Sequence, residues 1–336
     1  MLSPDILPYP GWGPTPITEL RRQSAEREYI WKGFLAPGKI TSLTALPKCG
    51  KTTFVSHLLK AMDGSVTEFC SRPVRAAKVM LISEEHPDLW IERRDRLGLG
   101  PHLATFHQPF LVPPTVDEWI LYLARLAVVV KQDHYELVVF DTMHNLWCVK
   151  KEEDAPQTIA ALTPLRMLTQ GDAAVLALFH STKADTSEGR LTQGTGAIGG
   201  LVDNIMEMRR FDAEREADTR RDIKSYSRFE ETPPEIVIEL DKEAKTFNLV
   251  GTKADARAAD RLETLLDLLP SDPPGLTVHE ILERWPSFDA RFPAEAAVAP
   301  RPAISSLRRD LETAKALGLV HVIGDGTEGT PFRYHT

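Results

Sequence analysis

The amino-acid sequence predicts an α/β protein with a mostly parallel β-sheet, followed by a small domain of helices and a β-hairpin. From residue 38 onward, short apolar segments alternate with amphipathic ones, for example KITSLTA before TTFVSHLLKAM. Strands that alternate with helices of about 10–15 residues are typical of βαβ units, and therefore of a parallel sheet. The segments LVVFD and VLALFH are apolar throughout, as expected of strands that are covered on both faces.

The pattern changes after residue 200. The segments NIMEMRR, RDIKSYSRFE, EIVIELD and TFNLVG follow one another without long helices, and we expect antiparallel strands that extend the sheet at its edge. Near the C-terminus, three segments with helical spacing precede LVHVIG, a DGTEG turn and TPFRYHT, which predicts a winged-helix domain. The expected divisions are an N-terminal arm (1–30), an α/β core (31–250), a linker (251–258) and a winged-helix domain (259–336).

Composition excludes several classes of protein. The chain has 336 residues, of which 42% are hydrophobic and 26% charged, so wholesale disorder is excluded. At about 150 residues per domain, this length favours two domains. The net charge of −8 excludes a polycation that coats nucleic acid. Three widely spaced cysteines indicate a reducing compartment, and we see neither a signal peptide nor an apolar run of about 20 residues. We therefore expect a soluble, cytoplasmic protein.

The strongest motif is the segment ALPKCGKTT, which lies between an apolar strand and an amphipathic helix. Backbone N–H groups of such a loop and the N-terminus of the helix can surround phosphate groups. Lys51 is expected to reach the β- and γ-phosphates of ATP, and the Thr52 hydroxyl to bind Mg²⁺. Ala45 replaces the usual first glycine. The predicted nucleotide-binding residues are Pro47, Lys48, Cys49, Gly50, Lys51, Thr52 and Thr53.

Three further strands end in residues that suit ATP hydrolysis. Asp141 ends the strand ELVVFD, where a carboxylate can hold Mg²⁺ through water. Glu84 follows the strand VMLIS and is the candidate base for the attacking water, with Glu85 as the alternative. His180 ends the strand ALFH and is a candidate sensor of the γ-phosphate, or else a polar residue that only terminates the strand.

Together these motifs resemble the RepA-type, RecA-like ATPases of the AAA family, which are related to the DnaB-class hexameric helicases. The resemblance covers about residues 30–250, and neither Ala45 nor Lys48, which departs from a further common glycine, removes Lys51 or Thr52. The supporting segments are WKGFLAPGKITSLTALPKCGKTT (31–53), LISEEHP (81–87), LVVFDTMHNL (137–146), ALFHSTK (177–183), GTGAIGGLVDNIMEMRR (194–210) and SRFEETPPEIVIEL (227–240).

The resemblance implies a homo-oligomeric ring, usually a hexamer, with ATP bound between subunits. It also implies that Glu84 is the catalytic carboxylate and Asp141 the Walker B carboxylate. Lys183, Arg209 or Arg210 would then reach the γ-phosphate of the next subunit, where a cation stabilises the transition state. For the two arginines, the alternative is a solvated strand end.

Two loops of such a ring would face its central channel. Aromatic and cationic side chains there can bind single-stranded DNA by stacking and by backbone charge. The acidic residues 152–154 offset the nearby lysines, so a mobile polar loop is the alternative. The candidate DNA-binding residues are Trp147, Lys150, Lys151 and Arg190.

The predicted winged helix has a candidate recognition helix, Ala303–Ala316, with Arg308 and Arg309 on it. Residues 258–336 carry a net charge of −4, the same as residues 1–257. Because phosphate contacts supply most nonspecific affinity for DNA, an acidic domain is suited to a protein partner at least as well as to DNA.

The leading functional hypothesis is an ATP-driven DNA helicase or translocase that acts in replication of a plasmid, phage or other mobile element. The alternative is a nucleotide-gated replication initiator, regulator or adaptor that binds DNA or a protein through its winged helix. A small-molecule kinase is disfavoured by the antiparallel strands, the appended C-terminal domain and the lack of an arginine-rich lid segment.

Overall fold

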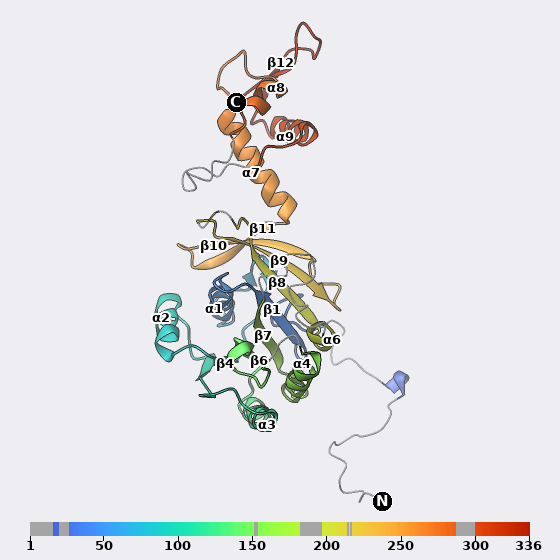
Figure 1. Cartoon of the computed structure of the whole chain (residues 1–336). Coiled ribbons are helices and arrows are strands. Elements are labelled where there is room, and N and C mark those ends of the chain that lie inside the picture. The colour runs from blue at the N-terminus through green and yellow to red at the C-terminus, as the bar shows by residue number, and fades with distance from the viewer. Residues whose placement is uncertain are drawn as a thin grey trace, which may run out of the picture.

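The computed structural model describes residues 16–19, 27–150, 154–181, 197–213, 215, 217–286 and 300–336. It shows an α/β core, built on one large sheet, and a smaller C-terminal part that continues from the long helix α7 (Figure 1).

The core contains a nine-stranded sheet with the order β11-β10-β9-β8-β1-β7-β6-β4-β5. The six strands from β5 to β8 pair in parallel, and β8 to β11 pair antiparallel at one edge. The predicted α/β class, a RecA-like core with a mostly parallel sheet and antiparallel edge strands, is confirmed. The strands of the sheet are β1 (Ile40–Ala45), β4 (Val79–Ser83), β5 (Leu103–His107), β6 (Leu137–Asp141), β7 (Ala174–His180), β8 (Asn204–Arg210), β9 (Arg220–Ser227), β10 (Glu235–Asp241) and β11 (Thr246–Gly251).

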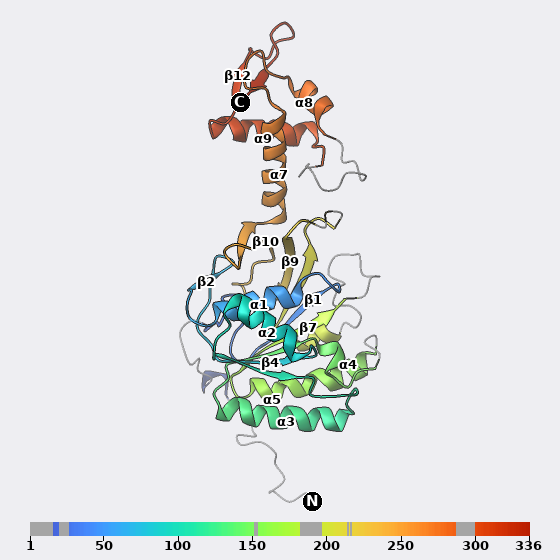
Figure 2. The same cartoon turned by 90° about the vertical axis from the view of Figure 1, so that its left-hand side faces the viewer.

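Helices cover both faces of the parallel half of the sheet (Figure 2). Two pack on one face, namely α1 (Lys51–Ala61) and α2 (Pro87–Leu97). The opposite face carries α3 (Val116–Gln132), α4 (Ala155–Leu162), α5 (Arg166–Thr169) and α6 (Ala197–Leu201). The remaining short elements of the core are the hairpin β2 (Glu68–Phe69) and β3 (Arg72–Pro73), and the 3-10 turns η2 (Ile17–Glu19), η3 (Met143–Asn145) and η4 (Thr163–Leu165).

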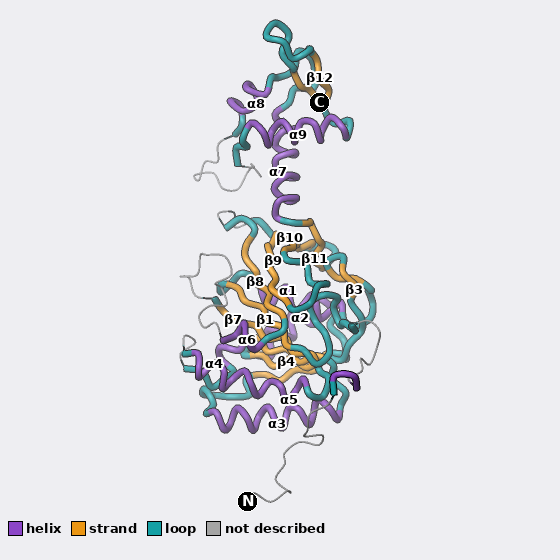
Figure 3. Tube along the Cα trace, turned by 90° about the vertical axis from the view of Figure 1, so that its right-hand side faces the viewer, coloured by secondary structure: helices purple, strands orange, loops and turns teal. Residues whose placement is uncertain are grey.

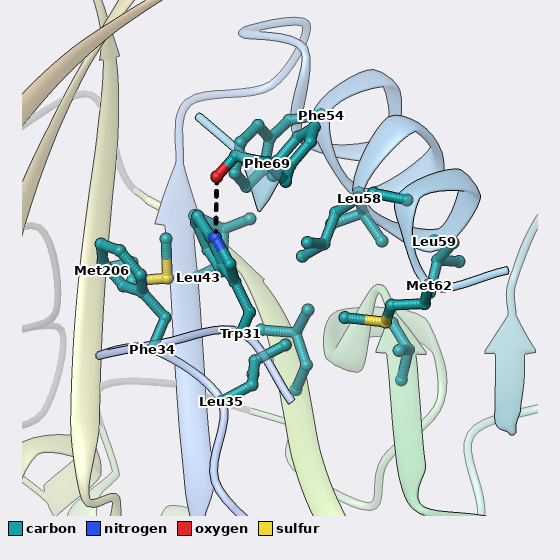
Figure 4. Packing of buried hydrophobic residues seen from close by; sticks show 14 of the residues in the cluster. Trp31, Phe34, Leu35, Leu43, Phe54, Leu58, Leu59, Met62, Phe69 and Met206 are labelled. Carbon is teal, nitrogen blue, oxygen red and sulfur yellow. Dashed lines mark hydrogen bonds between the residues drawn. The ribbon is translucent and has the colours of Figure 1, made fainter. Parts of the chain in front are cut away.

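Coverage on both faces explains why the parallel strands are apolar. All residues of β1, β4 and β6 are buried. On the α1 face, Trp31 stacks on Phe34 with ring centroids 4.1 Å apart, and its indole N–H donates a hydrogen bond to the Phe69 carbonyl at 3.1 Å (Figure 4). Residues just after the expected N-terminal arm therefore belong to the core.

The C-terminal part contains three helices and a short hairpin around a separate apolar cluster (Figure 3). Its first helix begins directly after β11, because the Thr252 hydroxyl accepts a hydrogen bond from the Asp255 N–H in a capping box. Most of the segment expected to be a linker, 251–258, is thus helical. The elements are α7 (Lys253–Leu268), α8 (Val278–Arg284), α9 (Ile304–Ala316), β12 (His321–Ile323) and β13 (Arg333–His335).

Candidate active site

The candidate site lies at the carboxyl ends of four neighbouring parallel strands, β1, β7, β6 and β4. The strand register places Ala45 beside His180 and Ser83 beside Asp141. Since parallel strands end at the same edge of a sheet, residues that follow them converge there, as ligand sites of open α/β sheets do.

The phosphate-binding loop joins β1 to α1. Lys48 and Gly50 have positive φ angles of 60° and 98°, and Gly50 is the N-cap of α1. Ala45 is the last residue of β1 and is fully buried in extended conformation. The position of the usual first glycine therefore needs no left-handed backbone here, which explains why alanine is accommodated.

Lys51 is buried beneath this loop. Its Nζ donates hydrogen bonds to the Ala45 carbonyl at 2.9 Å and to the Leu46 carbonyl at 3.4 Å, and lies 3.0 Å from Nδ1 of His180. Burial lowers the pKa of the Lys51 ammonium, while the charges of Cys49, Asp141 and Glu84 oppose that shift. A phosphate could replace these neutral contacts with a charge-assisted one.

Thr52 and Asp141 form the part of the site that suits a divalent cation. The Thr52 hydroxyl donates a hydrogen bond to Oδ1 of Asp141 at 3.2 Å. The other carboxylate oxygen, Oδ2, is buried and has no hydrogen-bond partner among the described residues. Burial first, and then the charges of Glu85 and Glu84, raise the pKa of Asp141 to about 7. A hydroxyl beside an unsatisfied buried carboxylate oxygen fits Mg²⁺ and its bound water.

Glu84 and Glu85 have different partners. The Glu84 carboxylate accepts hydrogen bonds from the Thr142 hydroxyl at 3.1 Å and from the side-chain amide of Asn145. Glu85 instead forms a two-point ion pair with the Arg93 guanidinium. The neutral partners of Glu84 leave its charge uncompensated by direct pairing, as a base requires, whereas the charge of Glu85 is neutralised.

The two candidate trans arginines lie on β8. Arg209 is 3.6 Å from Glu207 on the same strand, and its Nε and Nη2 have no hydrogen-bond partner within the described part of the chain. Arg210 is close enough to Cys49 of its own loop to oppose the burial-induced rise in that thiol's pKa. The third trans candidate, Lys183, lies outside the described residues.

The expected DNA-stacking role of Trp147 is wrong for this structure. Trp147 is 1% exposed and packs edge-on against Phe179 with ring centroids 5.5 Å apart. Apolar burial against the sheet outweighs exposure of this ring in the loop after β6. Lys150 is exposed, and Lys151 and Arg190 lie outside the described residues.

Two residues of the site were not anticipated from the sequence. Asn145 holds Glu84, and Arg221 of β9 donates a hydrogen bond from Nε to the Cys49 carbonyl at 2.7 Å. Asn145 stands four residues after Asp141, so its place in the same loop was the available signal. Arg221 is 172 positions from Cys49, and no local pattern marks it.

The fold and the gathered residues define a RecA-like P-loop ATPase. The chain belongs to the AAA domain family AAA_25, which residues 11–186 match. Among solved structures it is similar to the RadB recombinase (13% identity, TM-score 0.43, 64% of this chain and 91% of that one). It is also similar to the ATPase domain of a helicase (15% identity, TM-score 0.48, 62% of this chain and 84% of that one). No curated protein matches the sequence significantly.

A membrane-spanning helix was sought over the same described ranges. None of the helices there combines the length and the apolar character that crossing a bilayer requires.

Proposed function

We propose that this chain is a RepA-like ring ATPase that hydrolyses ATP to move on or unwind DNA in replication of a plasmid, phage or other mobile element. The observation that carries the proposal is the convergence of Lys51, Thr52, Asp141 and Glu84 at one edge of the sheet. These side chains come from three strands and match the parts that phosphoryl transfer to water needs.

Each residue of this set has a distinct task in the proposal. Lys51 binds the β- and γ-phosphates, and Thr52 and Asp141 hold Mg²⁺, which neutralises phosphate charge when bound. Glu84 accepts a proton from the attacking water and is oriented for this by Thr142 and Asn145.

His180, whose Nδ1 lies 3.0 Å from Lys51 Nζ, is placed to respond when Lys51 turns toward the γ-phosphate.

A ring assembly, with six subunits as the expected number, would complete the site. Arg209 supports this part of the proposal, because two of its guanidinium nitrogens lack hydrogen-bond partners in the described portion of the subunit. Arg209, Arg210 or Lys183 would supply a cation to the neighbouring subunit's γ-phosphate. The solution mass with and without an ATP analogue and Mg²⁺ tests this, since a strict monomer in both conditions would contradict the trans assignment.

ATP hydrolysis and strand displacement test the motor directly. Lys51→Ala is expected to abolish both, because the only buried cation of the loop is removed from the described site. Lys60→Ala on the same helix is the matched control, since Lys60 pairs with Asp63 near the helix end. Wild-type hydrolysis that ignores single-stranded DNA, together with no strand displacement, would contradict the motor.

The second candidate is a nucleotide-gated initiator, regulator or adaptor. Burial of Trp147 removes the aromatic residue from the proposed DNA channel, and residues 258–336 are acidic. We propose a winged helix at 259–336, with exposed Arg308 and Arg309 on α9 facing DNA or a protein partner. Binding of a duplex site or a partner that requires this part, without DNA-stimulated hydrolysis, would favour this candidate.

A further inference from the structure

Arg221 of β9 lies directly against the phosphate-binding loop. Besides the hydrogen bond from Nε to the Cys49 carbonyl, its Nη1 donates to the carbonyls of Arg220 at 2.7 Å and Asp218 at 3.0 Å. The guanidinium also packs on Gly50, where a Cβ would lie 3.8 Å from Nε. A half-buried cation is thus fixed at the two residues that precede Lys51.

The bond to Cys49 controls the direction of one loop N–H group. The C=O and N–H of a trans peptide group point in opposite directions, so a fixed Cys49 carbonyl also fixes the Gly50 N–H. A phosphate-binding loop depends on the direction of such N–H groups. Gly50 has the left-handed φ of 98°, and the Arg221 bond holds the peptide group on one side of it.

The positive charge of Arg221 is only partly offset by its neighbours. Its hydrogen bonds go to backbone carbonyls, whereas the Asp218 carboxylate accepts three hydrogen bonds at 2.9–3.2 Å from Arg220. The charge is therefore available to a polyanion at the loop, in addition to the charge of Lys51.

The strand around Arg221 is held from its other side. Arg220 pairs with Asp260 of α7 at 2.6 Å, and Asp222 pairs with Lys253 of α7 at 2.8 Å. Residues on both sides of Arg221 are thus fixed to the same helix. Side chains that position a site work best on such rigid support.

We propose that Arg221 is a positioning residue of the nucleotide site. It holds the Cys49–Gly50 peptide group in the orientation that binds phosphate, and it adds positive charge beside the loop. The inference rests on the proposed function as an ATPase and extends it to a residue on the antiparallel part of the sheet.

Binding of a fluorescent ATP analogue with Mg²⁺ to the full chain tests the proposal. Arg221→Ala is expected to raise the Kd about tenfold, which is the effect of losing one charge-assisted hydrogen bond. Arg221→Lys should recover only part of the affinity, because an ammonium lacks the planar fork that reaches three carbonyls. Arg228→Ala is the matched control, since Arg228 follows β9 and is 63% exposed beside Asp203.

Two further readouts separate positioning from a general loss of stability. Arg221→Ala should raise KM more than it lowers kcat, and should speed hydrogen exchange at residues 45–52 without nucleotide. If Arg221→Ala does not fold, Arg221→Gln and Arg221→Lys take its place, with the order of affinity Lys above Gln expected.

Wild-type nucleotide affinity in folded Arg221 variants would overturn the proposal. Failure of the proposed function looks different, because the wild type and Arg228→Ala would then also bind no nucleotide, and the inference would fall with it. A wild type that binds but does not hydrolyse ATP would remove the ATPase and leave the positioning role supported or overturned by the Kd values alone.

Discussion

Glu84 and Glu85 are adjacent carboxylates, yet only Glu84 has neutral partners. We expect Glu84→Gln to lower kcat by about 100-fold or more, because a general base contributes that much, while the Kd for nucleotide stays within about threefold of wild type. Glu85→Gln should retain most hydrolysis, since its carboxylate is engaged by Arg93. Steady-state hydrolysis and analogue binding measure both effects. The reverse order of activities would assign the base to Glu85.

The residues that the sequence could predict are those that follow apolar strands. Lys51, Asp141, Glu84 and His180 all lie within a few residues of a strand end, and the parallel topology brings such ends together. Arg221 could not be found in this way, because its partner is a backbone carbonyl 172 positions away. A contact between a side chain and a distant peptide group leaves no mark on local residue spacing.

At the scale of elements, the connection between β6 and α4 shows how burial changes a role inferred from residue type. Trp147 closes the apolar face that includes Phe179. We expect Trp147→Ala to lower the free energy of unfolding by about 3–5 kcal/mol, because a buried ring leaves a cavity. Chemical denaturation measures this value. Lys150→Ala, three residues along and exposed, should leave it nearly unchanged; equal small effects would place Trp147 outside the core.

The element that was hardest to delimit from sequence is α7. Its first residues are small and polar, which favoured a linker at 251–258, but a capping box at Thr252 and Asp255 starts the helix at once. The strand β5 was also not predicted, because Leu103–His107 is a half-exposed edge strand without a continuous apolar run. Elements with a buried face were found, and those defined by a cap or an edge position were not.

At the scale of the whole molecule, β9 is in contact with both the nucleotide site and the C-terminal part. Arg221 bonds the phosphate-binding loop, and its neighbours Arg220 and Asp222 form ion pairs with α7. Asp222 is 1% exposed, so its pair with Lys253 is costly to break once formed. The loop and α7 are therefore joined through three consecutive residues, which gives a physical route for energetic coupling.

This connection predicts that bound nucleotide changes the stability of α7. With a slowly hydrolysed ATP analogue and Mg²⁺, hydrogen exchange at residues 253–260 should slow about fivefold, the low end of typical coupling between sites. Residues 304–316 of α9 should be much less affected, because they do not contact β9 in the described structure. Asp260→Asn removes a partner of Arg220 and should reduce the protection of α7 while residues 45–52 remain protected. Equal protection of α7 in this variant would show that the coupling does not pass through the Arg220–Asp260 pair, and no change in the wild type would show that the two parts respond independently.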